Sequence, residues 1–244
     1  MGSCLIAYSG GVDSSFLLKV ALDTIPGKIL ALTFDSGLQT KKEINEAALL
    51  AVSLGVPHRI IKADFLKDKK IKANSLKRCY FCKHKLLNGL KCLARKEDFK
   101  FIAEASTVSD EKDFRPGARA VKELGISSPL KEVGFTKKEI RVLSKKMGLK
   151  NWNKPSEPCL ATRVAYDRPL EKSILKRVEL AEEIIKKMGF NELRVRDYDD
   201  FCRIEVVKKD IPKLILNSKQ IVDRFKKIGY NYITIDLEGY RSKI

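Results

Sequence analysis

The sequence contains no run of apolar residues long enough to cross a membrane. Its 244 residues hold no stretch that approaches the ~20 uninterrupted apolar residues of a membrane-spanning helix. The N-terminus also lacks a charged region followed by a cleavable apolar segment, so we expect no secretory signal and a cytoplasmic location. Thiols in that compartment stay reduced, and the six cysteines are therefore not expected to form a disulfide framework.

Acidic residues are too few to balance the basic ones. The chain has 31 Asp and Glu against 49 Lys and Arg, a net charge of +18, and residues 62–100 carry half of that excess. The imbalance favours an anionic partner, such as a nucleotide, a nucleic acid or a phosphorylated substrate. A solvated, lysine-rich surface is the alternative. The hydrophobic content of 44% is ample for a buried core and argues against global disorder.

Short β-type segments alternate with helical ones through the first part of the chain. The pattern predicts strands over 4–8, 28–34, 58–62 and 100–104, and helices over 13–22, 41–54, 82–96 and 136–147. Thr136 and Glu139 form a predicted capping box at the start of the last helix. Such alternation implies a mostly parallel, Rossmann-like sheet covered on both faces. Ligands of such α/β sheets bind beyond the carboxyl ends of the strands, where the connecting loops share one face.

The order of elements changes beyond an irregular, proline-containing connection at 151–158. The pattern there predicts a helix over 170–188, strands over 193–196 and 202–207, a helix over 210–228 and a strand over 232–237. This α-β-β-α-β run indicates a small α+β module. We therefore expect an α/β domain over 1–155 and a C-terminal α+β domain over 156–244.

A phosphate-binding loop is predicted where the first strand gives way to a helix, at Ser9-Gly10-Gly11-Val12-Asp13-Ser14-Ser15. Gly10 and Gly11 permit a tight turn, and the free N–H groups of a helix start can hold an anion. The sequence lacks Gly-Lys-Ser/Thr here, so the loop is not a Walker A loop, and it lacks Gly-x-Gly-x-x-Gly, which disfavours a dinucleotide fold. An ordinary glycine-rich turn with a serine cap is the structural alternative.

Three cysteines form a second candidate constellation. Cys79 and Cys82 make a C-x-x-C pair at a predicted helix start, and Cys159 follows in the irregular connection. Three thiolates can bind a [4Fe–4S] cluster and leave one iron open. A zinc site would need a fourth ligand, for which His84 and Cys92 are candidates, and a redox C-x-x-C pair would give Cys159 no role. The remaining cysteines are expected to be buried: Cys4, Cys92 and Cys202.

The loop closely matches the SGGxDS signature of the N-type ATP pyrophosphatases, whose members cleave ATP between the α and β phosphates. Four further segments resemble the LarE-type family of ATP-dependent sulfur transferases, in that family's order: 110–117, 148–155, 157–163 and 193–196. The resemblance runs from Leu5 to about Arg241. It implies an adenine nucleotide alpha hydrolase-like domain that carries the pyrophosphate (PP) loop, followed by a small α+β domain, and a homo-oligomer that is a hexamer in at least one branch.

The resemblance also implies a substrate and a reaction. The substrate would be pyridinium-3,5-biscarboxylic acid mononucleotide, each carboxylate being activated with AMP before sulfur replaces its oxygen. The product would be the dithiocarboxylate nucleotide of nickel-pincer cofactor synthesis. ATP, Mg²⁺ and a [4Fe–4S] cluster on Cys79, Cys82 and Cys159 would be the cofactors, with a sulfide donor that the sequence does not identify.

The resemblance to the family implies a role for individual residues, position by position. Those implied for ATP are Ser9, Gly10, Gly11, Val12, Asp13, Ser14, Ser15, Phe34, Ser36 and Ala105, with Asp13 near Mg²⁺ and Glu104 in the adenine segment. Those implied for the substrate phosphate are Arg194, Arg196, Arg163 and Glu182, with Arg115 as a further candidate and Glu205 as a metal candidate. Lys83 would face the acyl-adenylate, or else be an ordinary solvated lysine. Arg194 and Arg196 alternate along one predicted strand, so both point to the same face.

Alternatives to the cluster reaction remain open at this stage. In one branch of the family the cysteine that matches Cys159 gives up its own sulfur, but that branch lacks the thiols that match Cys79 and Cys82. A tRNA thiolase uses the same loop and cluster and suits the positive charge, although this chain has no second C-x-x-C pair. An ammonia-using synthetase or NAD synthase would leave the cysteines idle, and a nucleotide-binding regulator would keep the loop without turnover.

Overall fold

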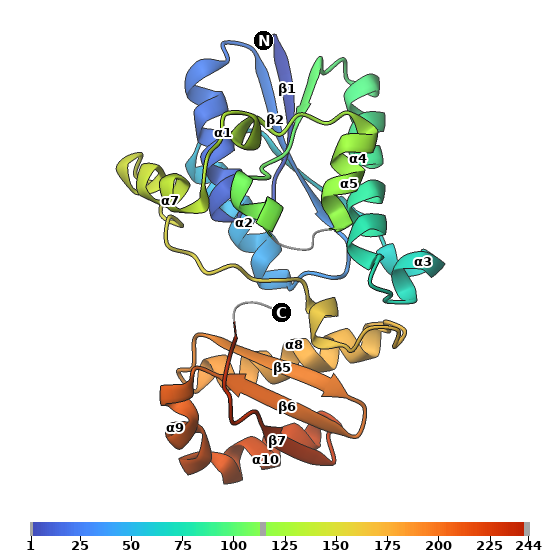
Figure 1. The fold of residues 1–244 in the computed structure, drawn as a ribbon, viewed down its shortest axis with the longest axis vertical. Coiled ribbons are helices and arrows are strands. Elements are labelled where there is room, and N and C mark those ends of the chain that lie inside the picture. The colour runs from blue at the N-terminus through green and yellow to red at the C-terminus, as the bar shows by residue number, and fades with distance from the viewer. Residues whose placement is uncertain (1, 113–115, 242–244) are drawn as a thin grey trace. The chain divides into compact units, whose positions relative to one another are not determined.

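The computed structural model describes residues 2–112 and 116–241, and the chain divides into two compact units (Figure 1). Unit 1 comprises Met1–Phe65 and Leu76–Glu157, and unit 2 comprises Leu66–Ser75 and Pro158–Ile244. The short insertion from the first half of the chain is held in unit 2 by hydrogen bonds. Leu170 N donates to Lys72 O at 2.7 Å, and Asn74 Nδ2 donates to Ala165 O at 2.7 Å. The insertion includes helix α3 (Lys69–Lys72).

Unit 1 is built on a fully parallel sheet. Its strands are β1 (Ser3–Ala7), β2 (Lys28–Asp35), β3 (His58–Lys62) and β4 (Phe101–Ala103), in the order β3-β2-β1-β4. The two central strands are almost entirely buried, because their apolar runs are covered on both faces. The expected Rossmann-like parallel sheet is confirmed, and the loops after the four strands start from one edge.

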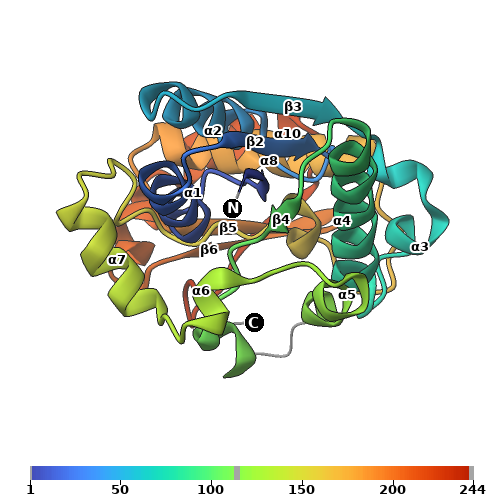
Figure 2. The ribbon, with the colours of Figure 1, turned by 90° about the horizontal axis from the view of Figure 1, so that it is seen from above.

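Helices cover both faces of this sheet (Figure 2). On one face, α1 (Val12–Thr24), α2 (Lys41–Ser53), α6 (Pro129–Glu132) and α7 (Lys137–Lys146) share a core. On the other face, α4 (Arg78–Lys96) and α5 (Pro116–Leu124) pack on the sheet through Leu87, Leu90 and Val121. The capping box predicted at Thr136 and Glu139 is confirmed, since each side chain bonds the other's backbone N–H.

Unit 2 contains a mixed sheet in the order β5-β6-β7. Its strands are β5 (Leu193–Tyr198), β6 (Phe201–Val206) and β7 (Tyr232–Ile235), antiparallel between the first two and parallel between the last two. Helix α8 (Lys172–Lys187) precedes them, and α9 (Ile211–Leu216) and α10 (Ser218–Lys227) lie between β6 and β7. This is the expected α+β module.

One helix of this module differs from its prediction. The sequence pattern gave a single helix over 210–228, whereas the structure has two helices that meet at Asn217. Asn217 Nδ2 donates to the carbonyl of Lys213 at 2.8 Å, a local bond that asparagine offers at helix ends. Among the described residues, no helix is long and apolar enough to span a membrane.

Candidate functional site

The PP loop occupies the carboxyl end of β1, where the chain turns into α1. Gly10 adopts a left-handed backbone conformation with φ +71°, which favours glycine. A Cβ built there would lie 2.7 Å from the Cβ of Ala47, so α2 packs directly on the loop. The loop therefore requires glycine for two reasons, its backbone angle and the close approach of a helix.

Hydroxyl groups of the loop bond to one another and hold its shape. Ser9 Oγ and Ser14 Oγ are 3.1 Å apart, and Ser14 Oγ donates to the carbonyl of Gly11 at 3.1 Å. Asp13 lies half-buried in the first turn of α1, where the helix dipole favours an anion. A glycine turn that opens a helix is a place where proteins bind anions, and the phosphate-binding role of this loop stays a prediction.

Asn151 reaches the same loop from the far end of unit 1, and sequence reasoning assigned it no role. Its Nδ2 donates to Gly10 O at 3.1 Å and to Ser15 Oγ at 3.0 Å. The residue lies in the irregular segment after α7, where neither periodicity nor spacing singles out one asparagine. Its contribution could be found only from the fold.

Two residues predicted to contact the nucleoside, Phe34 and Ser36, lie at the end of β2. The Phe34 ring is buried in the core against α4, at the position of Gly89. The Phe34 carbonyl accepts a hydrogen bond from Gln39 Nε2 at 3.2 Å. Ser36 is also buried and its Oγ bonds to Gln39 Oε1. Phe34 can thus serve a nucleotide only through its backbone, because its ring is a core contact.

A buried ion pair lies at the end of β4. Lys83 Nζ is 2.6 Å from Glu104 Oε2, and Glu104 is 1% exposed. Glu104 also accepts hydrogen bonds from Ser106 and Ser128. Burial raises the pKa of Glu104, but Lys83 and these hydrogen bonds outweigh burial and hold the pKa below its usual value. Lys83 is therefore held by the buried carboxylate of Glu104, which distinguishes it from a lysine that solvent alone surrounds.

Cys79 and Cys82 lie in the first turns of α4, three residues apart and so on one side of the helix. Cys79 is exposed and Cys82 is half-buried. The buried Arg78 donates from Nη2 to Cys79 Sγ at 3.8 Å. Both thiols are placed on an accessible helix start, which suits a ligand or a nucleophile.

The other cysteines test the expectation of burial. Cys4 and Cys202 are buried, and burial raises their thiol pKa values to about 11 and about 12. Cys92 is exposed, so its expected burial is wrong. It lies on the solvent side of α4, a helix whose core-facing residues include Leu90 and Ala94.

Cys159 belongs to unit 2, where it immediately precedes the short 3₁₀ helix Leu160–Arg163. Its carbonyl accepts bonds from Thr162 N at 2.9 Å and from Arg163 Nη1 at 3.3 Å. Arg163 Nη1 also donates to the carbonyl of Pro158. The guanidinium group of Arg163 thus holds the Cys159 backbone. The family resemblance implies phosphate binding for the same arginine.

Arg163 is itself buried in a two-point ion pair with Glu182. The Nε–Oε1 distance is 2.8 Å and the Nη2–Oε2 distance is 3.0 Å. Glu182 Oε1 also accepts from Val195 N at 3.1 Å. Both residues were expected near the substrate phosphate; the structure pairs them with each other, and their role in phosphate binding stays a prediction. Arg115, the further phosphate candidate, lies outside the described residues.

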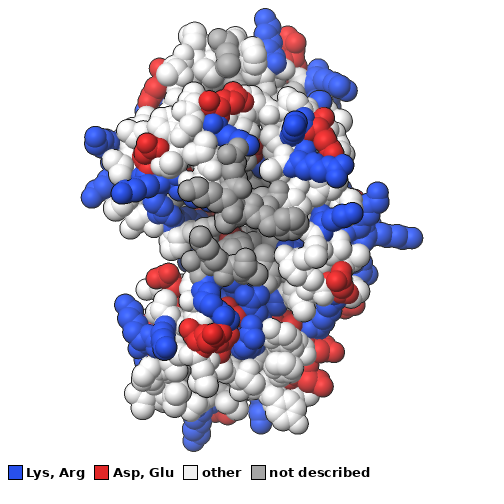
Figure 3. Space-filling view, viewed as in Figure 1, with Lys and Arg blue, Asp and Glu red and all other residues white. Residues whose placement is uncertain are grey.

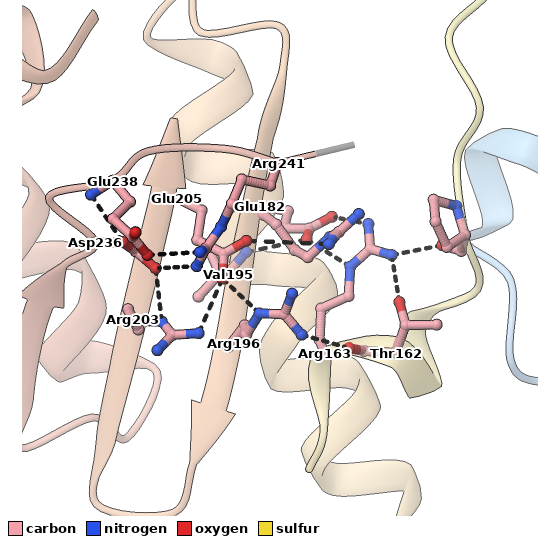
Figure 4. A network of polar contacts seen from close by, with 12 residues as sticks. Thr162, Arg163, Glu182, Val195, Arg196, Arg203, Glu205, Asp236, Glu238 and Arg241 are labelled. Atoms are coloured by element: carbon pink, nitrogen blue, oxygen red, sulfur yellow. Dashed lines mark hydrogen bonds and ion pairs between the residues drawn. The ribbon is translucent and has the colours of Figure 1, made fainter. Parts of the chain in front are cut away.

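A cluster of guanidinium groups surrounds Glu205 on the β5–β6 sheet (Figure 4). Arg196 and Arg203 both contact Glu205 Oε1, and Arg194 Nη1 is 4.0 Å from Oε2. Glu205 is 1% exposed, so its charge is compensated by these three cations. Cations so placed would repel a metal ion, and the surroundings of Glu205 are those of an anion site rather than a metal site. Within residues 2–112 and 116–241, no group of three or more His, Cys, Asp or Glu side chains is arranged to hold a metal ion.

Arg194 is the least satisfied group of this cluster. Its side chain is fully buried, and Nε, Nη1 and Nη2 lack hydrogen-bond partners among the residues that the structure describes. Burial lowers its pKa, opposed by Tyr240, over whose ring the guanidinium lies at 5.1 Å. A buried guanidinium with unused donors is suited to a carboxylate or phosphate ligand.

The chain is similar to several known proteins. The family model "Queuosine biosynthesis protein QueC" matches residues 3–82, which include the PP loop. An uncharacterized protein of Synechocystis sp. is 36% identical over 98% of this chain and 90% of its own length. A pyridinium-3,5-bisthiocarboxylic acid mononucleotide synthase of Lactiplantibacillus plantarum is 32% identical over 97% of this chain and 86% of its own length.

These matches extend along both units and agree with the PP loop on a parallel sheet. An uncharacterized protein of Methanocaldococcus jannaschii adds a third match, 32% identical over 98% of this chain and 90% of its own. Because the similarity to the L. plantarum synthase covers nearly the whole of both sequences, the chain belongs to the LarE-type family of ATP-dependent sulfur transferases, within the N-type ATP pyrophosphatases.

Proposed function

We propose that this protein converts the carboxylates of pyridinium-3,5-biscarboxylic acid mononucleotide into thiocarboxylates, the product serving nickel-pincer cofactor synthesis. The observation that carries the proposal is the similarity, over nearly the whole chain, to an enzyme named for the bisthiocarboxylic acid mononucleotide. Two features of this chain support it independently. The PP loop suits ATP, and the buried, unsatisfied Arg194 suits the anionic end of a nucleotide.

The PP loop would serve the activation step. A carboxylate oxygen attacks the α phosphorus of ATP, pyrophosphate leaves, and an acyl-adenylate remains. The N–H groups at the start of α1 and the hydroxyls of Ser9 and Ser14 would stabilise the charge that develops on pyrophosphate. Asp13 would hold Mg²⁺ beside that leaving group, since a carboxylate in the first turn offers the oxygen ligand that Mg²⁺ prefers.

Lys83 would face the acyl-adenylate at the end of β4. Its ammonium group is oriented by Glu104 at 2.6 Å, and Glu104 is in turn held by Ser106 and Ser128. Sulfide then attacks the activated carbonyl carbon, and AMP departs with the former carboxylate oxygen. In unit 2, Arg194 with Arg196 would bind the substrate phosphate, and the Arg163–Glu182 pair would support the Cys159 backbone.

The donor set of Cys79, Cys82 and Cys159 fits a [4Fe–4S] cluster. Three soft thiolate ligands are available, one exposed and two half-buried, with Cys79 and Cys82 on one side of a helix. A bound cluster would supply the sulfide. Loss of sulfur from Cys159 itself is the mechanistic alternative.

Anaerobic purification with iron and sulfide quantification tests the cluster. We expect about four iron atoms per chain, as in a [4Fe–4S] protein, with iron lost in Cys79→Ala. Cys92→Ala is the matched control, because Cys92 is exposed on the same helix and should leave the iron content unchanged. Full iron content in Cys79→Ala would contradict the three-cysteine site.

Turnover assays separate the remaining alternatives. Pyrophosphate release should depend on the biscarboxylate nucleotide, and release without it would contradict the proposed substrate. Mass spectrometry of the protein after turnover should show Cys159 intact. A mass loss equal to one H₂S at Cys159 would instead show sacrificial transfer.

A further inference from the structure

The peptide between Gly10 and Gly11 lies at the turn of the PP loop, where β1 gives way to α1. Gly10 has φ +71° and Gly11 has φ −75° and ψ 167°. Neither residue has a Cβ, so no side chain of their own opposes rotation of the peptide that joins them. Such a rotation would break the bond from the Gly11 N–H to Ser9 Oγ and turn a carbonyl oxygen toward an anion bound at the helix start, which would repel the anion.

Asn151 opposes this rotation. Its Nδ2 donates to Gly10 O at 3.1 Å and, with its second hydrogen, to Ser15 Oγ at 3.0 Å. Ser15 is fully buried in α1, so the amide is fixed between the loop and the helix. The C=O and N–H of a trans peptide point in opposite directions. Holding the Gly10 carbonyl on Asn151 therefore directs the Gly11 N–H away from Asn151, and this N–H donates to Ser9 Oγ at 3.3 Å.

The segment that carries Asn151 is itself held in place. Arg141 Nη1 donates to the carbonyl of Trp152 at 3.2 Å, and Arg141 Nη2 donates to that of Lys154 at 2.8 Å. Lys154 N donates back to the carbonyl of Asn151 at 3.0 Å. These bonds position the backbone of Asn151, so its amide reaches the loop from a defined support.

We propose that Asn151 is a positioning residue of the ATP site, which locks the Gly10–Gly11 peptide so that the Gly11 N–H holds the Ser9 hydroxyl and the Gly10 carbonyl stays turned away from the pyrophosphate. The proposal rests on the proposed function, because it takes the loop as the pyrophosphate site. Asn151 acts through the loop backbone, and the amide therefore contributes to ATP and pyrophosphate binding and not to binding of the second substrate.

The test compares Asn151→Asp and Asn151→Leu with wild type in the full-length protein. Aspartate keeps the size of asparagine but cannot donate, and its negative charge faces the Gly10 carbonyl. Loss of one hydrogen bond predicts roughly three- to tenfold weaker binding of Mg²⁺–pyrophosphate and a KM for ATP raised by the same factor. The loss of Mg²⁺–pyrophosphate affinity should be larger for Asn151→Asp than for Asn151→Leu. The KM for the biscarboxylate nucleotide should not change.

Asn153→Leu is the matched control, because Asn153 is exposed two residues further along the same segment. It should bind Mg²⁺–pyrophosphate like wild type, and thermal unfolding of each variant reports on general damage. Wild-type pyrophosphate affinity in Asn151→Asp would overturn the inference, and so would an equal loss in Asn153→Leu. A wild-type chain that binds neither ATP nor pyrophosphate would instead overturn the proposed function, a result that is visible without any variant.

Discussion

Lys83 and Arg194 show how differently this chain compensates positive charge at single residues. Lys83 is matched by Glu104 at 2.6 Å, with further hydrogen bonds from Ser106 and Ser128 to the carboxylate. Arg194 has Glu205 at 4.0 Å, and that carboxylate is shared with other guanidinium groups. A buried charge with unused donors reduces stability, so a protein keeps it where a ligand needs it.

Replacement of Arg194 by methionine should separate stability from binding. Methionine keeps an unbranched apolar side chain and removes the unsatisfied guanidinium, so we expect the free energy of unfolding to rise by about 1–3 kcal/mol. Binding of the substrate nucleotide should be lost. Urea unfolding and calorimetric titration with the biscarboxylate nucleotide measure the two effects. A less stable variant would show that the guanidinium is a structural group and not a ligand-binding one.

Among the elements, α4 carries both thiols of the C-x-x-C pair and the lysine that pairs with Glu104. Cys79, Cys82 and Lys83 lie in its first turns, and Gly89 faces the Phe34 ring from two turns further on. A Cβ at Gly89 would lie 2.7 Å from Phe34 Cζ. The glycine therefore sets how closely α4 approaches β2, and so where the start of the helix lies at the edge of the sheet.

Gly89→Ala should destabilise the protein although alanine is the better helix former. Alanine adds about 1 kcal/mol of helix propensity, whereas overpacking against a buried ring costs typically 1–3 kcal/mol, so a small net loss is expected. Chemical denaturation measures it. Gly117→Ala in α5 is the control, because its Cβ would meet the nearest atom at an ordinary 3.5 Å. Rescue of Gly89→Ala by Phe34→Leu would confirm the ring as the cause, and a stabilised Gly89→Ala would contradict it.

Predictions about elements succeeded where the signal was local. The four strands of unit 1 and the capping box at Thr136 rest on periodicity and on one three-residue spacing. The single helix expected over 210–228 was wrong, because the bond of Asn217 to the Lys213 carbonyl competes with continuation of the helix. Sequence periodicity does not report such a bond.

For the molecule as a whole, half of the net charge of +18 comes from residues 62–100, and the other half is spread along the rest of the chain. On the face that Figure 3 shows, basic side chains occur on both units with acidic ones between them. Several arginines are already committed within the fold, including Arg163 to Glu182 and Arg196 to Glu205. This pattern favours small anions bound at defined places over a long nucleic acid.

Binding to tRNA should accordingly be weak and sensitive to salt. Electrostatic binding of a nucleic acid falls steeply with salt concentration, by about 10³–10⁵ between 50 and 200 mM for six to ten phosphate contacts. We therefore expect no tRNA complex in filter binding at 200 mM salt, while Mg²⁺–ATP binding persists. A tight tRNA complex under these conditions would favour the tRNA thiolase reading over the small-substrate one.

The amino-acid sequence alone determined the alternation of strands and helices, the PP loop and the three candidate thiols. Each of these features depends on residue type and on spacing along the chain, and both can be seen in the sequence without knowledge of the tertiary structure. Tertiary structure decided which side chains meet. It placed Asn151 on Gly10 across 141 positions and paired Arg163 with Glu182. It also brought residues 66–75 into unit 2. A polar side chain can bond many partners, and only the packed fold selects one.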